Sequence, residues 1–250
     1  MGCQALRAIC KRDIKLSGPD TNTPLVKALK EYSVFLGVIA FTVIALTIGM
    51  LLPVASTPPS AELPWQIEQG ADGMRVFGLT LGHSSLNDAQ AKFHEQAEIS
   101  LFVSDAGQLA AEAYFDQVNL GGLRAKVVLA ASLTQNQLQD MYERGIRISG
   151  MSSGRKIELH PDDKARVLNA AIASINYLPS SSLEEAVLVQ RFGEPRRRVH
   201  EEKNEILHLL YPQHGLDIAL NAKNKAVFQY VAPAEFETLI APLLAIQPAK

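Results

Sequence analysis

The chain has only two cysteines, Cys3 and Cys10, and both lie within its first ten residues. The long remainder of the chain cannot form disulfide bonds, so its own hydrophobic core must stabilise it. Aromatic residues make up 6% of the 250 residues, which is too few for a surface that stacks nucleic-acid bases. The formal net charge is −2, so we expect no electrostatic binding of nucleic acid.

Charge is missing altogether between Glu31 and Glu62, and the sequence from Val34 to Leu52 is apolar except for two threonines and two glycines. A helix of about 20 apolar residues is long enough to cross the hydrocarbon core of a bilayer. A buried helix of a globular protein normally keeps a polar stripe, and this segment has none. We therefore predict a transmembrane helix over residues 32–56 that binds the lipid bilayer.

The residues on either side of this segment predict its orientation. Three acidic residues precede the segment together with six basic residues, namely Arg7, Lys11, Arg12, Lys15, Lys27 and Lys30. Basic residues on one side favour a cytosolic N-terminus. The prediction is an uncleaved signal anchor in the cell inner (cytoplasmic) membrane, with a cytosolic segment at 1–31 and a periplasmic domain after the span. Cleavage near Val54–Ser56 and acylation of Cys3 or Cys10 stay open alternatives.

Residues 57–77 are predicted to form a proline-rich linker and entry segment, since Pro58, Pro59 and Pro64 lie there among small residues. The chain after the apolar segment carries 18 basic and 23 acidic side chains, a net charge of −5. Such a domain is acidic, which again argues against a nucleic-acid partner.

Two stretches of this domain look alike. Each starts with a serine followed three positions later by an acid, Ser85 with Asp88 and Ser182 with Glu185, which is the pattern of a helix capping box. Alternating apolar residues and turn residues follow each helix and predict antiparallel hairpins. We expect closing helices over 134–144 and 233–244, and between the two stretches a hairpin over 146–159 and a helix over about 162–177.

The predicted fold class is α+β: a single N-terminal transmembrane helix, then two similar units that each pack a short helix on a small antiparallel sheet. The first unit, with the extra hairpin and helix, spans residues 78–178. The second unit spans residues 179–250. The chain is thus interpreted as containing an internal repeat.

The second stretch resembles a known family. It reads Ser182-Leu-Glu-Glu-Ala, then Phe192-Gly-Glu-Pro195, Leu209-Leu-Tyr-Pro and Gly215-Leu-Asp-Ile, and is similar to the repeat of the SmpA/OmlA-type envelope lipoproteins and the β-lactamase inhibitor proteins. The likeness covers mainly residues 182–231. It implies a short helix before a meandering antiparallel sheet whose face docks onto other proteins. The chain departs from the lipoproteins in having an apolar segment where they have a lipidated cysteine.

Gly150-Met-Ser-Ser-Gly154 fits the pattern of a hydrolase nucleophile with Ser152 at its centre. That motif requires a turn between a strand and a helix, whereas both flanks here predict strands, so a hairpin loop is the favoured interpretation. Likewise His160, Pro161, Asp162 and Asp163 have the residue types of a helix start.

No histidine pair has the close spacing of metal ligands; the six are His83, His94, His160, His200, His208 and His214. Arg196, Arg197 and Arg198 precede two glutamates, which predicts a solvated strand that neutralises itself. We therefore assign no catalytic, cofactor-binding or metal-binding residue.

The sequence thus predicts a membrane-anchored, non-catalytic protein-binding or envelope-assembly module, with a protein partner and no cofactor, metal or nucleic acid. Small residues on the predicted strands, such as Ala111, Ala113 and Ala219, would leave room for a partner or for packed helices. A serine hydrolase that uses Ser152 and a lipid or small-ligand carrier are the alternatives.

Overall fold

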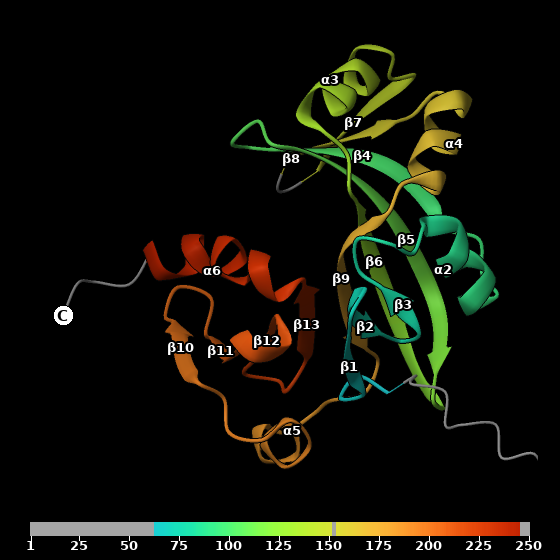
Figure 1. Ribbon diagram of the computed structural model, residues 1–250. Helices are drawn as coiled ribbons and strands as arrows, with labels where there is room; N and C mark the ends of the chain where they lie inside the picture. The colour runs from blue at the N-terminus through green and yellow to red at the C-terminus, as the bar shows by residue number, and fades with distance from the viewer. Residues whose placement is uncertain (1–62, 152–153, 246–250) are drawn as a thin grey trace, which may run out of the picture. The chain divides into compact units, whose positions relative to one another are not determined.

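A ten-stranded antiparallel sheet forms the main body of the described chain (Figure 1). The computed structural model describes residues 63–151 and 154–245. Contacts divide the chain into residues 1–57 and 58–250, and all the described residues belong to the second unit. The strand order is β10-β11-β12-β13-β9-β6-β5-β4-β8-β7, with bounds β4 (Glu98–Ser104), β5 (Leu109–Leu120), β6 (Leu123–Ala131), β7 (Arg147–Met151), β8 (Gly154–Glu158), β9 (Ile172–Pro179), β10 (Arg197–Glu201), β11 (Ile206–Tyr211), β12 (Leu216–Asn221) and β13 (Ala226–Val231).

Five short helices and a second, three-stranded sheet complete the described unit. The helices are α2 (Leu86–Phe93), α3 (Gln135–Glu143), α4 (Pro161–Asn169), α5 (Glu185–Phe192) and α6 (Phe236–Ala245), and the small sheet consists of β1 (Ile67–Gly70), β2 (Gly73–Val76) and β3 (Leu79–Thr80).

Capping chemistry explains where two of the helices begin. The Ser85 side chain accepts from the backbone N–H of Asp88 while the Asp88 carboxylate accepts from the backbone N–H of Ser85, so the predicted capping box of α2 is confirmed. Thr134 begins α3 in the same way. The box predicted at Ser182 is wrong, since α5 begins at Glu185 behind Glu184, which makes no side-chain cap bond.

Strand β9 is the element that gives the sheet its size. The sequence predicts one helix over residues 162–177, but α4 ends at Asn169 and the chain turns into a strand at Ile172. β9 pairs with β6 on one side and with β13 on the other. From Ile175 to Pro179 its side chains alternate, with Ile175, Tyr177 and Pro179 buried and Asn176 and Leu178 half-buried, which is the period of a strand and not of a helix.

The fold class predicted from the sequence is therefore wrong in its main feature. Because β9 joins the strands of the two expected units edge to edge, they do not form two small separate sheets. The described chain is one large antiparallel sheet with a small sheet and five short helices. The interpretation as an internal repeat of two units is corrected with it.

The predicted membrane span over 32–56 lies outside the described residues. Among residues 63–151 and 154–245, no helix is long and apolar enough to cross a membrane. The description of the chain as a signal-anchored membrane protein thus has no support in the structure.

Two hydrophobic cores lie on opposite faces of the large sheet. Alternation along β11 directs Leu209 and Tyr211 into the larger core, and Leu210 between them into the smaller one. The larger core also takes side chains from β1–β3 and from α2, α3, α4 and α5. In the smaller core, Phe236 and Ile240 of α6 pack on β10, β11 and β13. Among the small strand residues, Ala111 and Ala113 are buried in the larger core, so they serve packing.

Candidate functional site: an exposed edge strand

β7 is one of the two edges of the large sheet, and every one of its five residues is exposed. It pairs with β8 alone, in a regular antiparallel register from Arg147 opposite Glu158 to Met151 opposite Gly154. Along its other side the backbone N–H and C=O groups have no strand to pair with among the described residues. Such an edge is a template for the addition of another strand.

The exposed apolar side chains of the described chain are concentrated at this edge. Ile146 is 58% exposed, Ile148 is 55% exposed and Met151 is 51% exposed. The one other exposed large apolar side chain among the described residues is Val187 of α5, at 40%. A soluble surface normally scatters such residues singly, so three within the six residues from Ile146 to Met151, at the outer edge of the sheet, indicate a contact surface.

Alternation divides these side chains between the two faces of the sheet. Ile148 lies opposite the buried Ile157, so it continues the apolar surface of the larger core beyond the edge. Ser149 and Met151 point to the other face, together with Arg147. A strand added to β7 would meet apolar side chains on both faces.

Helices α3 and α4 lie near β7 (Figure 1), and a charged contact joins them. At the end of α3, Arg144 donates from Nε and from Nη2 to the two carboxylate oxygens of Asp163 in α4, at 3.1 and 2.6 Å. The Asp163 side chain is 2% exposed, and its hydrogen bonds and charge raise the pKa of Arg144. Two residues later, the backbone N–H of Ile146 donates to the carbonyl of Glu158 at 2.8 Å. These contacts hold the start of β7 against α4 and β8.

Positive charge without an ionic partner surrounds β7. Arg147 and Arg155 make no ion pair with any described residue, although the Arg155 guanidinium lies 5.9 Å from the centre of the Tyr142 ring. Lys156 is different, since its ammonium pairs with Glu98 of β4. In a chain whose net charge is negative, the edge carries a local excess of positive charge.

The opposite edge of the sheet, β10, has a different surface. Its one large apolar side chain, Val199, is buried under α6. Arg198 forms ion pairs with Glu185 at 2.8 Å and Glu194 at 3.1 Å, so its partners are other glutamates than the two that follow the arginine run in the sequence. Charged side chains along an edge strand oppose strand addition. β7 is therefore the open edge of the two.

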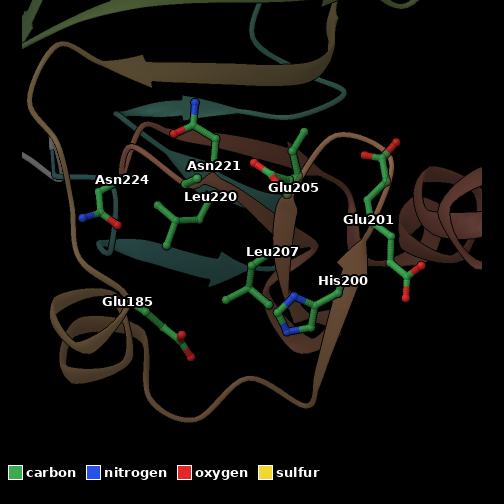
Figure 2. A pocket seen from close by; sticks show the side chains of 11 residues that line it. Glu185, His200, Glu201, Glu205, Leu207, Leu220, Asn221 and Asn224 are labelled. Atoms are coloured by element: carbon green, nitrogen blue, oxygen red, sulfur yellow. The ribbon is translucent and has the colours of Figure 1, made fainter.

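A hollow of about 790 Å³ lies where strands β10 to β13 end near the start of α5 (Figure 2). Its wall contains Glu185, Glu201 and Glu205 together with His200, Leu207, Leu220 and Asn221 (Figure 2), and Glu202 also lines it. A carrier of lipid would need an enclosed apolar cavity. This open, acidic hollow does not have that character.

The candidate residues of a hydrolase fall in the hairpin that carries β7. Ser152 itself lies outside the described residues. Strands β7 and β8 precede and follow it and pair antiparallel, so the hairpin predicted over 146–159 is confirmed and the motif does not lead from a strand into a helix. His160 and Pro161 begin α4 as predicted, and the backbone N–H of Asp162 donates to His160 Nδ1 at 3.4 Å.

The histidines do not come together as metal ligands. In the part of the chain that the structure describes, no group of three or more His, Cys, Asp or Glu side chains could hold a metal ion. His208 instead contacts Asp217 of the neighbouring strand, Nδ1 to Oδ2 at 2.8 Å, and its Nε2 lies 3.9 Å from Glu201. Burial lowers the pKa of His208, but the hydrogen bond and charge of Asp217 and the charge of Glu201 outweigh burial and raise it.

Comparison with known proteins adds little to these observations. No protein-family model matches the chain, and no curated protein matches it. Among solved structures, the chain is similar to the crystal structure of a DUF4309-family protein, YjgB, from Bacillus subtilis, with 13% identity over 64% of this chain and 88% of that one and a TM-score of 0.30. A likeness this weak carries no conclusion about fold or function. The resemblance of residues 182–231 to the SmpA/OmlA-type lipoproteins stays a prediction, as does the location in a bacterial-type envelope.

The sequence contains only part of the signal for this edge. Ile146-Arg-Ile148 predicts a strand, and apolar residues on a strand are normally expected to face a core. The stretch between Gly145 and Gly150 has a single charge, so its residues do not mark it as an edge strand. The sequence therefore does not indicate on which side of the hairpin the sheet continues. Only the order β4-β8-β7 reveals that β7 is outermost.

Proposed function

We propose that the protein is a non-catalytic protein-binding module that captures an extended segment of another protein as an additional strand on β7. The observation that carries the proposal is the exposure of Ile146, Ile148 and Met151 along the unpaired edge of the ten-stranded sheet. In strand addition, main-chain hydrogen bonds give affinity and contacts to alternate side chains give specificity. β7 offers both kinds of contact.

The support beneath β7 favours this function. Association is less costly when the binding surface is already ordered, and here the Arg144–Asp163 contact and the pairing with β8 hold the edge in its extended form. Glycine at position 145 lets the chain before β7 lie close to β8, because a Cβ at Gly145 would collide with the Ile157 side chain.

The test uses a fluorescent peptide in which valine alternates with serine and glutamine, titrated with the full-length chain and followed by anisotropy. We expect saturable binding that weakens in Ile148→Lys. Burial of a whole isoleucine side chain is worth roughly 1.5–3 kcal/mol, and Ile148 is 55% exposed. Loss of this surface is therefore worth about 1 kcal/mol, or about a fivefold loss of affinity.

Val187→Lys is the matched control, because it introduces the same residue at the other exposed apolar position, on α5; it should bind like the unmodified chain. A peptide methylated on alternate backbone nitrogens should not bind, since it cannot complete the ladder. Equal binding by Ile148→Lys and Val187→Lys, or by the methylated peptide, would contradict strand addition at β7.

A further inference from the structure

The charges around β7 define the chemistry of its partner. This inference rests on the proposed function: if an extended segment joins β7, the geometry points to a segment that has apolar residues and an acidic residue on each of its two faces. Arg147 and Arg155 have no ionic partner among the described residues, and each lies on or next to the exposed edge. The nearby Lys156 and Arg144 are already paired, so these two arginines are the charges left for a partner.

The two arginines point to opposite faces of the hairpin. Arg147 lies opposite Glu158, whereas Arg155 lies opposite Gly150. Three positions separate Arg147 from Gly150, so alternation places the two pairs on different faces. A bound strand would therefore have one arginine on each of its two faces. Two acidic residues of the partner that are an odd number of positions apart point to opposite faces, so each could contact one of the arginines.

Gly150 gives Arg155 access to the partner although Arg155 belongs to the second strand from the edge. A Cβ placed on Gly150 would meet no atom within 4 Å, so the face of β7 beside Arg155 is open at this position. Neighbouring strands lie about 4.8 Å apart, which places the added strand about 10 Å from β8 in backbone terms. An arginine and a glutamate side chain together bridge that distance.

A second copy of this chain fits the edge less well. If β7 strands of two copies paired, the interface between them would contain two Arg147 and two Arg155 side chains. Like charges across a strand pair are destabilising. Charge complementarity thus favours an acidic segment of a different protein.

The experiment compares three peptides of one design on the full-length chain: a valine-rich strand with two variable positions three residues apart, one on each face, which hold glutamine, glutamate or lysine. We expect the glutamate peptide to bind about tenfold more tightly than the glutamine peptide at low salt, because two exposed ion pairs are each worth up to about 1 kcal/mol. The lysine peptide should bind most weakly. High salt should reduce the differences, since exposed charges are screened.

Variants locate the effect. Arg147→Glu should reverse the preference between the glutamate and lysine peptides, and Arg155→Gln should reduce it while binding of the glutamine peptide stays the same. Arg124→Glu in β6 is the matched control, because Arg124 is also exposed and lies beyond β4 and β5; it should leave the preference unchanged.

The outcomes separate this inference from the proposed function. If the glutamine peptide binds and Ile148→Lys weakens it, but the three peptides bind alike, the edge captures strands and the acidic partner is refuted. If the preference survives in Arg147→Glu and Arg155→Gln, the two arginines are not its origin and the inference fails. If no peptide binds, both the function and the inference fail.

Discussion

Replacement of His208 by leucine should lower the free energy of unfolding, because it removes the partner of a buried charge on the neighbouring strand. Asp217 is 3% exposed, its Oδ2 accepts from His208 Nδ1 at 2.8 Å, and its Oδ1 has no hydrogen-bond partner. His208→Leu would leave this carboxylate buried without its partner. Removal of one member of a buried charged pair costs about 3–5 kcal/mol, and we expect a loss of about 3 kcal/mol, because the Asp217 carboxylate would lose its hydrogen bond from His208.

The double variant His208→Leu/Asp217→Leu distinguishes this cause from a simple packing defect. A buried ion pair replaced by apolar residues is often neutral or stabilising, so the double variant should recover most of the lost stability. Urea unfolding of the full-length chain, followed by circular dichroism and by the fluorescence of Trp65, measures both. A single variant that loses less than about 1 kcal/mol, or a double variant no more stable than the single, would refute the reasoning on these charges.

Three further predictions concern stability. The pKa of His208 is raised in the folded chain. Its contribution to stability is therefore complete below the ordinary histidine pKa of about 6.5 and is lost as the pH rises through the folded-state pKa. Between pH 6 and pH 9, the urea midpoint should fall more in the unmodified chain than in His208→Gln. Arg144→Leu should lower the midpoint more than Arg166→Leu, because Arg144 bonds the buried Asp163 at 2.6 Å whereas Arg166 lies 3.9 Å away; equal effects would contradict this. Gly154→Ala should cost about 2 kcal/mol or more, since its φ is +137° and a Cβ would collide with the Val103 carbonyl; an unchanged melting temperature would show that β8 can shift away from β4.

Local chemistry in the sequence predicted the ends of several elements well. The pairs Ser85 with Asp88 and His160 with Pro161 mark the starts of α2 and α4, and Gly193, with φ of +81°, ends α5. Such signals involve residues within one turn of each other, so they depend little on tertiary context; the pattern at Ser182 is an exception, since α5 begins at Glu185.

The arrangement of the strands could not be predicted in the same way. The segment around Ile172 reads as helix because it follows a strong helix start without a proline or glycine to end it. Its strand character comes from pairing with β6 and β13, which lie far from it in the sequence. Tertiary context of this kind overrides local propensity.

The candidate site depended on the same long-range information. Exposure of Ile146 and Ile148 follows from the outermost place of β7 in the sheet. The sequence contains the residues, but not the order of the strands. The contact of Arg144 with Asp163, which supports the edge, likewise joins two helices that the sequence treats separately.

The central position of β9 also bears on how the chain folds as it is synthesised. Until residues 172–179 leave the ribosome, β6 has an unpaired edge, and once β9 covers it the open edge moves to β9 itself until β13 arrives. Non-local pairing of this kind is slow, and bare edges in partly folded chains promote aggregation. A chaperone that binds extended apolar segments would thus find its target in the middle of this sheet during synthesis, at a place that the finished fold hides completely.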